Sequence, residues 1–215
     1  MIVAFDTYYY DGYSYTVGGV FESWTDPKVK YYTTSKRLVI DAEYKSGELY
    51  KRELPCIMQC LSMINVDNID TIIVDGFVWL SEDGEELTKG LGARLYDAIK
   101  EKYGFDISIV GVAKNPYHAD IPYCRKVFRG VESKKPLYVT CSTPDIAEYY
   151  AILIRKMHGD NRIPTILKAI DSKSRECMDN STNEEEKHDS EPINIDFGSF
   201  EEWLAETEKN GFRYR

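Results

Sequence analysis

The sequence has few cysteines, no long apolar run and no excess of positive charge. Its five cysteines are an odd number without a Cys-x-x-Cys pair, and so neither a disulfide framework nor a zinc ribbon is indicated. No uncharged apolar stretch reaches the length of about 18 residues that suggests a membrane-spanning helix. The first residues, Met-Ile-Val-Ala-Phe-Asp, lack the basic region of a signal peptide. These absences predict a cytoplasmic protein that does not enter a membrane.

The charge of the chain is negative and unevenly distributed. The 215 residues include 36 acidic and 27 basic side chains, a net charge of −9, which argues against a general nucleic-acid binder. Residues 173–215 contain 12 acids and 6 bases, so that residues 1–172 are close to neutral. We expect a folded domain over 1–172 and an acidic, flexible tail over 173–215. A capping box at 199–202 predicts a short amphipathic C-terminal helix, which can dock on its own domain or on a partner protein.

The order of apolar segments predicts a mixed β-sheet with helices on its faces. A meander of strands is expected at 2–6, 16–24, 29–34 and 37–42, with a turn between 8 and 15. Helices are expected from Pro55 onward and at 85–102, 144–157 and 164–170, and further strands at 71–74, 107–113 and 137–140. Strand, helix, strand in sequence implies a right-handed crossover and parallel pairing. The predicted class is α/β, a ribonuclease H-like sheet with an N-terminal meander and then parallel strands, flanked by helices.

Three acidic residues lie at the ends of these elements. Asp6 and Asp75 each follow an apolar strand, and Glu53 precedes Pro55 at the entrance of a helix. Taken singly, such an Asp is more typical of a turn or a helix cap, and such a Glu of a favourable charge at a helix start. Taken together, they indicate a fold that gathers carboxylates around hard cations such as Mg²⁺, as a metal-dependent phosphodiesterase does.

The segments that carry these acids resemble endonuclease V. The chain matches the family block Tyr-Ile-Pro-Gly-Phe-Leu-Ser-Phe-Arg-Glu-x-Pro at Tyr44, Gly47, Leu49, Arg52, Glu53 and Pro55. Ile-Ile-Val-Asp75-Gly76 is similar to the family's Val-Asp-Gly, the segment 90–93 to its glycine-rich helix, and 109–114 to its Ile-Gly-Val-Ala-Lys. Order and spacing agree over roughly residues 1–172.

The resemblance implies an enzyme that cuts a DNA or RNA strand near a deaminated base, chiefly inosine. Asp6, Glu53 and Asp75 are similar to the family's ligands for Mg²⁺ or Mn²⁺, and Lys114 is similar to its lysine near the scissile phosphate, where an ammonium offsets developing charge. The resemblance also implies a set of nucleic-acid contacts at Tyr44, Gly47, Leu49, Gly76 and Trp79. A large aromatic at the last of these positions can meet a flipped base or can pack beneath its loop.

The chain departs from the family pattern at three places. The family's wedge, the element Tyr-Ile-Pro-Gly that separates bases, has become Tyr-Lys-Ser-Gly at 44–47. A histidine and an arginine of the family pattern are missing after Gly76. The family's late Thr-Gly-His-Arg has become Thr-Cys-Ser-Thr at 140–143. Asp145, one helical turn beyond the missing late histidine, is a candidate replacement ligand for the metal. A wedge without its proline predicts activity that favours single-stranded or mismatched nucleic acid.

Two hypotheses follow from this pattern. The retained acids favour a metal-dependent endonuclease, whereas the missing histidines, the altered wedge and the negative charge favour a relative that binds nucleic acid or protein with weak or lost catalysis. A run of tyrosines, Tyr8 to Tyr10 with Tyr13, is a further feature of the N-terminal part. Such a run can stack on bases, or it can be divided between core and surface.

Overall fold

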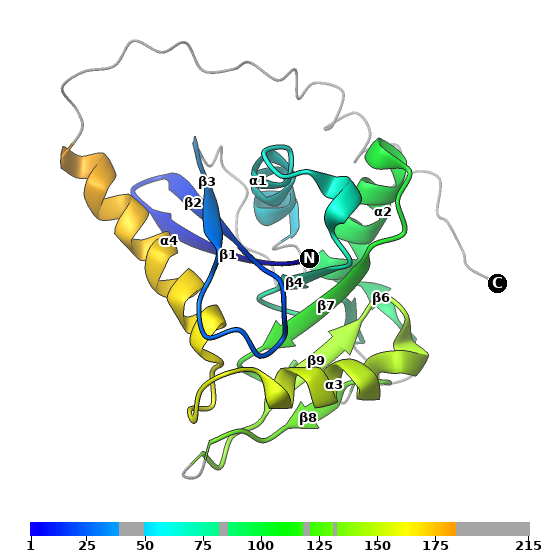
Figure 1. Cartoon of the computed structure of the whole chain (residues 1–215). Helices are drawn as coiled ribbons and strands as arrows, with labels where there is room; N and C mark the ends of the chain where they lie inside the picture. The colour runs from blue at the N-terminus through cyan, green and yellow to red at the C-terminus, as the bar shows by residue number, and fades with distance from the viewer. Residues whose placement is uncertain (39–49, 82–85, 118–120, 131–132, 184–215) are drawn as a thin grey trace. The chain divides into compact units, whose positions relative to one another are not determined.

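The sheet at the centre of the chain has seven strands in the order β3-β2-β1-β4-β7-β9-β8 (Figure 1). The computed structural model describes residues 1–38, 50–81, 86–117, 121–130 and 133–183. The strands of the sheet are β1 (Ile2–Tyr10), β2 (Tyr13–Phe21), β3 (Tyr31–Leu38), β4 (Thr71–Val74), β7 (Ser108–Ala113), β8 (Arg125–Val127) and β9 (Leu137–Cys141). Two short strands, β5 (Trp79–Leu80) and β6 (Thr88–Lys89), pair separately. The predicted ribonuclease H-like mixed sheet is confirmed.

Strand directions divide the sheet into three parts. β1, β2 and β3 form the predicted antiparallel meander, and β1, β4 and β7 run parallel, as the crossover argument requires. β9 is antiparallel to both β7 and β8, and so the parallel part ends at β7. Because of this direction, the carboxyl end of β9 lies beside the first half of β7, and not beside its carboxyl end.

The hairpin of β1 and β2 is longer than predicted. The expected turn over 8–15 is wrong, because β1 continues to Tyr10 and the turn consists of Asp11 and Gly12, both with positive φ (48° and 75°). A two-residue Asp-Gly turn of this kind matches the twist of the flanking strands. The tyrosines on either side of it are strand residues, as their β-propensity favours.

Four α-helices, α1 (Tyr50–Leu61), α2 (Leu91–Tyr103), α3 (Ala147–Lys156) and α4 (Thr165–Asn183), occur in the described part of the chain, with short 3₁₀ turns η1 (Val66–Asn68) and η2 (Pro144–Ile146). α1 begins before Pro55, which therefore lies inside the helix and not at its start. α2 starts at Leu91, later than predicted, and ends at Gly104, whose φ of 76° makes it the expected glycine stop. α4 continues well beyond the predicted residue 170.

The helices cover the two faces of the sheet (Figure 1). α1 packs on β2 and β3, and α2 packs on β7 and α1. On the opposite face, a core shared by the sheet, α3 and α4 contains Ala4, Ile73, Val110, Val112, Ile154, Ile166 and Ile170. Since side chains alternate along a strand, the residues two positions beyond Ala4, Ile73 and Val112 point to the same face as α4.

The predicted division at residue 172 falls inside helix α4, and the compact unit comprises Met1–Thr182. The predicted C-terminal helix at 199–202 and beyond lies outside the described residues, as does the altered wedge at 44–47. In the described part of the chain, no helix is both long and apolar enough to cross a membrane.

Candidate active site

Asp6, Asp75 and Lys114 meet at one edge of the parallel strands. Phe5 pairs with Val74, and Val74 pairs with Gly111, so the residue after Phe5 and the residue after Val74 are neighbours. Each of the three lies two positions after a residue of the core that α4 covers, namely Ala4, Ile73 and Val112. Because side chains alternate along a strand, the three side chains point to the face that α4 covers. The carboxyl edge of parallel strands is where open α/β sheets place their ligand sites. The structure therefore places Asp6, Asp75 and Lys114 in the lining of one pocket.

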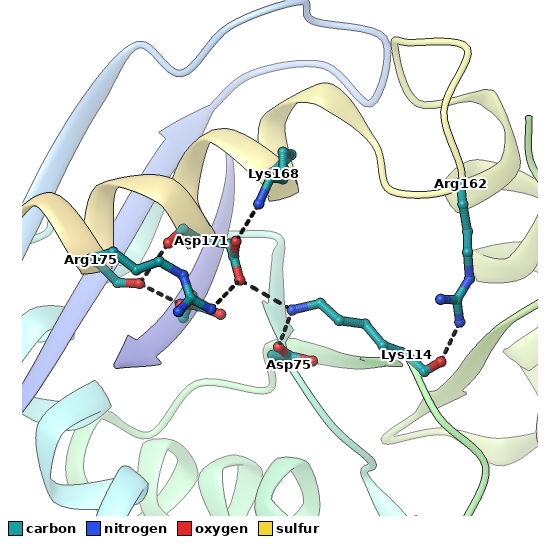
Figure 2. Close-up of polar contacts among 8 residues, drawn as sticks. Asp75, Lys114, Arg162, Lys168, Asp171 and Arg175 are labelled. Atoms are coloured by element: carbon teal, nitrogen blue, oxygen red, sulfur yellow. Dashed lines mark hydrogen bonds and ion pairs between the residues drawn. The ribbon is translucent and has the colours of Figure 1, made fainter. Parts of the chain in front are cut away.

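Lys114 links two carboxylates that are far apart in the sequence (Figure 2). Its Nζ donates to Asp75 Oδ2 at 2.8 Å and to Asp171 Oδ1 at 3.3 Å. Asp171 also accepts from Lys168 Nζ at 2.7 Å and contacts Arg175 Nη2 at 3.5 Å. Helix α4 therefore contributes one more carboxylate, Asp171, together with two further cations, to the edge where Asp6 and Asp75 lie.

Two more side chains, Ser174 and Arg162, hold this group in place. Ser174 of α4 donates from Oγ to Asp6 Oδ2 at 2.6 Å. The Arg162 guanidinium donates to the backbone carbonyl of Lys114 (Figure 2) and, at 2.7 Å, to that of Pro136. Asp6 and Lys114 are thus oriented from the α4 side of the sheet by side chains near and within that helix.

Glu53 approaches the same edge from the opposite side. It lies in the first turns of α1 and is 9% exposed. Burial raises the pKa of its carboxyl well above the usual range, and the negative charges of Asp75 and Asp6 add to this. The Tyr9 hydroxyl lies beside Glu53 and acts in the opposite direction, although its oxygen makes no hydrogen bond of standard geometry within the described residues. Glu53 is therefore a buried acid among like charges.

The charges of the other group members follow from their surroundings. Burial raises the pKa of Asp6, with a further contribution from Asp75, while the Ser174 hydrogen bond opposes them. Burial alone would lower the pKa of Lys114, but the hydrogen bond to Asp75 and the charges of Asp75, Asp171 and Asp6 reverse this and raise it. Burial would raise the pKa of Asp171, but hydrogen bonds and charges from Lys168 and Lys114 lower it. The Lys114 ammonium therefore compensates part of the negative charge at this edge through its pairs with Asp75 and Asp171.

The donor chemistry of the group suits a hard divalent cation. Carboxylate oxygens are the ligands that Mg²⁺ and Mn²⁺ prefer. The +2 charge of such a cation would relieve the repulsion that acts on Glu53. In the arrangement seen among the described residues, no three His, Cys, Asp or Glu side chains already converge as metal ligands. Lys114 and Ser174 occupy oxygens of Asp75 and Asp6, and so these two contacts have to change if both aspartates bind a cation.

A pocket lies between this edge of the sheet and α4. Its polar end is formed by Asp6, Asp75 and Lys114. Its apolar wall is formed by side chains of the sheet, of α4 and of the segment before α4, among them Val112, Leu137, Ile163, Leu167 and Ile170. The charged groups therefore stand at the border between an apolar interior and the surface, where their interactions are stronger than in water.

The structure does not bring Asp145 to this group. β9 runs antiparallel to β7, so that Tyr138 pairs with Ala113 but Cys141 pairs with Val110. The chain after Cys141 therefore lies toward the start of β7, at the opposite end from Lys114. Asp145 is exposed in η2 at that end. Asp171 stands at the carboxylate edge instead, and the sequence reasoning missed it.

The predicted nucleic-acid contacts are placed in part. Tyr44, Gly47 and Leu49 lie outside the described residues. Gly76, with φ of 140°, turns the chain directly after Asp75. Trp79 donates from Nε1 to the carbonyl of Cys141 at 3.0 Å, which fixes its indole against β9 and favours the packing alternative.

Comparison with known proteins identifies the fold. No protein-family model and no curated protein matches this chain. Among solved structures, endonuclease V from Ciona intestinalis, in complex with a 24mer DNA containing an inosine followed by a ribo-adenosine, matches with a TM-score of 0.65 at 19% identity over 84% of this chain and 86% of that chain. The chain has an endonuclease V-like fold.

Two further endonuclease V structures agree. The human protein matches with a TM-score of 0.60 at 20% identity over 84% of this chain and 85% of that chain. The Bacillus subtilis protein matches with a TM-score of 0.60 at 18% identity over 85% of this chain and 81% of that chain. At this level of identity the likeness concerns the fold, and it confirms the fold expected from the sequence motifs.

Proposed function

We propose that this chain is a divalent-metal-dependent endonuclease that hydrolyses phosphodiester bonds in DNA or RNA. The observation that supports the proposal is that Asp6 and Asp75 line one pocket at the edge of the sheet, and that Glu53 of α1 is close enough for their charges to act on it. Nothing in the packing requires three acids there, because like charges at a buried site destabilise the fold. Such an arrangement is expected where a cation of high charge belongs.

In this proposal each residue has a separate task. Asp6, Glu53 and Asp75 would hold Mg²⁺ or Mn²⁺, which when bound supplies the positive charge that activates water and stabilises the leaving 3′ oxygen. Ser174 keeps the Asp6 carboxylate oriented toward the site. Lys114 would turn from Asp75 toward the scissile phosphate, where its ammonium offsets developing negative charge. Asp171 and Arg162 hold the side chain and the backbone of Lys114.

Two features point to the substrate class: the inosine-containing DNA in the complex with the Ciona intestinalis protein, and the altered wedge at 44–47 of this chain. The endonuclease V of Ciona intestinalis was solved with DNA that contains an inosine, and so cleavage near deaminated bases such as inosine is the specificity to test first. The substitution of Ile-Pro by Lys-Ser at 45–46 removes a rigid element. Because flipping a paired base costs a few kcal/mol, we expect single-stranded or mismatched strands to be favoured.

A second candidate function is a binding module with weak or lost catalysis. The observation that favours it is the Lys114 ammonium, which already bridges Asp75 and Asp171 and so compensates two of the carboxylates without a metal. A chain that has replaced its cation with a lysine in this way would keep the fold and could keep affinity for nucleic acid or for a protein partner. Catalytic measurements separate the two candidates.

The test is strand cleavage on four matched oligonucleotides, single- and double-stranded, each with and without one inosine. The wild type is compared with Asp6→Asn and with Asp106→Asn, the same chemical change at an exposed aspartate that pairs with Lys100. The proposal expects cleavage that needs Mg²⁺ or Mn²⁺, is lost in Asp6→Asn and is kept in Asp106→Asn. Equal cleavage by all three proteins would indicate a contaminant, and no cleavage by any of them would favour the binding module.

A further inference from the structure

The β1–β2 hairpin extends beyond Asp6 and carries tyrosines on the same face as that carboxylate. Tyr8 pairs with Tyr15, and Tyr10 pairs with Tyr13 across the two strands. Residues directly opposite each other in an antiparallel pair point to one side of the sheet, and alternation along β1 gives Tyr8 and Tyr10 the same side as Asp6. The four rings therefore form a continuous strip that begins next to the candidate active site.

Two cations lie over these rings. Arg175 of α4 places its guanidinium carbon 4.7 Å from the centre of the Tyr8 ring. Lys36 of β3, which pairs with Tyr15, places Nζ 4.4 Å from the centre of the Tyr13 ring and 5.5 Å from that of Tyr15. All three distances are within the range of about 6 Å for cation–π attraction. The strip thus combines aromatic faces with positive charges held in fixed places.

The exposure of the strip increases away from the core. Tyr15 is buried at 4%, Tyr8 and Tyr13 are partly buried, and Tyr10 is 48% exposed. Lys36 is exposed, and the Arg175 side chain is 56% exposed even though it also contacts Asp171. The inner tyrosine supports the sheet, whereas the outer rings and the cationic heads remain available to a ligand. Packing alone does not account for an exposed ring at the hairpin tip.

We propose that this aromatic–cationic strip, formed by Tyr8, Tyr10, Tyr13, Tyr15, Lys36 and Arg175, binds single-stranded DNA or RNA and leads the strand to Asp6. Basic side chains interleaved with aromatic rings are the composition of surfaces that bind single strands, because phosphates meet the cations while bases stack on the rings. Tyr8 and Tyr10 follow Asp6 at a rise of about 6.6–6.8 Å per two residues, so the strip extends roughly 13 Å from the carboxylates. The inference rests on the proposed function in that the bound strand is the substrate.

The test measures binding without cleavage. Fluorescence anisotropy with a labelled oligothymidylate and a labelled oligouridylate, in EDTA at low salt, compares the wild type with Tyr10→Ala and Lys36→Gln. Loss of one base stack should weaken binding by Tyr10→Ala at least about fivefold. Loss of one phosphate contact should reduce the slope of log K against log salt for Lys36→Gln by about 0.7. A blunt duplex, whose bases are not free to stack, should show no effect of Tyr10→Ala.

Matched controls test whether the location matters. Tyr149→Ala removes another exposed tyrosine, 57% exposed on α3, and Lys102→Gln removes another lysine that lies over a tyrosine, at 5.2 Å from the Tyr103 ring on α2. Both controls should bind like the wild type. The inference is overturned if Tyr10→Ala and Lys36→Gln also bind single strands like the wild type, or if the controls lose as much affinity.

The result also separates this inference from the proposed function. Because EDTA prevents cleavage, weakened binding in the strip variants supports the inference even when no protein cleaves any substrate, and in that case only the endonuclease proposal fails. Conversely, Asp6-dependent cleavage together with unaltered binding in both strip variants supports the endonuclease and overturns the strip.

Discussion

Replacing Glu53 by Gln should stabilise the protein in the absence of metal. The carboxylate is 9% exposed, and the charges of Asp75 and Asp6 act on it in addition to its burial. The amide keeps the shape of the side chain and removes the charge. In most buried positions such a change breaks a useful contact, but here it removes repulsion, and so the sign of the effect is the informative quantity.

The magnitude follows from the cost of an uncompensated buried polar group. That cost is roughly 1–3 kcal/mol, and for a chain of this size each kcal/mol moves the melting temperature by about 2–4 °C. Glu53→Gln should therefore melt about 2–12 °C above the wild type in EDTA at neutral pH. With saturating Mg²⁺ this difference in melting temperature should become smaller or change sign, because the wild type gains stability from the cation and the variant has lost a ligand.

The pH dependence gives a second check. Burial and the two aspartates raise the pKa of Glu53 in the folded state above that of the unfolded chain, so the folded protein binds this proton more tightly. The wild type is then penalised as pH rises above the unfolded carboxyl pKa of about 4.3 and through the raised folded pKa. The advantage of Glu53→Gln should be absent in acid and grow toward neutral pH.

The assay is thermal melting followed by circular dichroism in EDTA, from acid to neutral pH, with Glu22→Gln as control. Glu22 is 67% exposed and pairs with Lys30, so its replacement should change the melting temperature little. A melting temperature for Glu53→Gln below that of the wild type at neutral pH, or a difference that does not vary with pH, would refute the reasoning.

Three other predictions concern the metal, Lys114 and the acidic tail. Mg²⁺ or Mn²⁺ should raise the melting temperature of the wild type, and Asp75→Asn should lose most of that rise, whereas an equal rise in both proteins would place the cation elsewhere. Lys114→Met should lower the melting temperature in EDTA by about 2–4 °C, since its half-exposed pairs contribute about 1 kcal/mol, and an unchanged value would mean that the pairs stabilise nothing. Residues 184–215 contain ten acids and four bases, and their negative charge opposes the approach of phosphates. Deleting them should strengthen nucleic-acid binding in filter assays at low salt but not at physiological salt, where the charge is screened. Weaker binding after the deletion would assign this segment to the binding surface.

The sequence contained enough information for Asp6 and Asp75 because local rules decide their positions. Each follows a short apolar run, which for Asp6 lies within the longer strand β1. A strand–helix–strand order forces parallel pairing, so it could be predicted from the sequence that the two residues lie close together. Lys114 was indicated only by the resemblance to endonuclease V. The same motifs also include Asp6 and Asp75, and the solved structures confirm the fold that the motifs indicate.

Asp171 and Ser174 could not be found in this way. They lie on α4, whose apolar spacing weakens after Ile170, so the helix was expected to stop before them. Asp145 was expected near the acids because it stands close to the position of the family's missing late histidine. Only the antiparallel register of β9 shows that this residue lies at the other end of the sheet, since a strand pattern carries no information on direction. Long-range contacts such as Ser174 to Asp6 have no local signature in the sequence.

The tyrosine run shows the same limit. Its β-propensity predicts strand, yet a tyrosine cluster beside Asp-Gly is also typical of a turn, and composition does not choose between them. The strip exists because the register pairs Tyr8 with Tyr15 and Tyr10 with Tyr13, and a register is set by the whole sheet.

The most direct test of the proposed metal centre is to locate Mn²⁺ in crystals of the wild-type protein by anomalous scattering. Mn²⁺ should be bound by Asp6, Glu53 and Asp75, with Lys114 no longer bonded to Asp75. Crystals of Asp75→Asn should show no anomalous peak at this site. Mn²⁺ that binds only elsewhere, or a Lys114 that still bridges Asp75 and Asp171 at saturating Mn²⁺, would contradict the claim that these carboxylates form a metal-dependent catalytic centre.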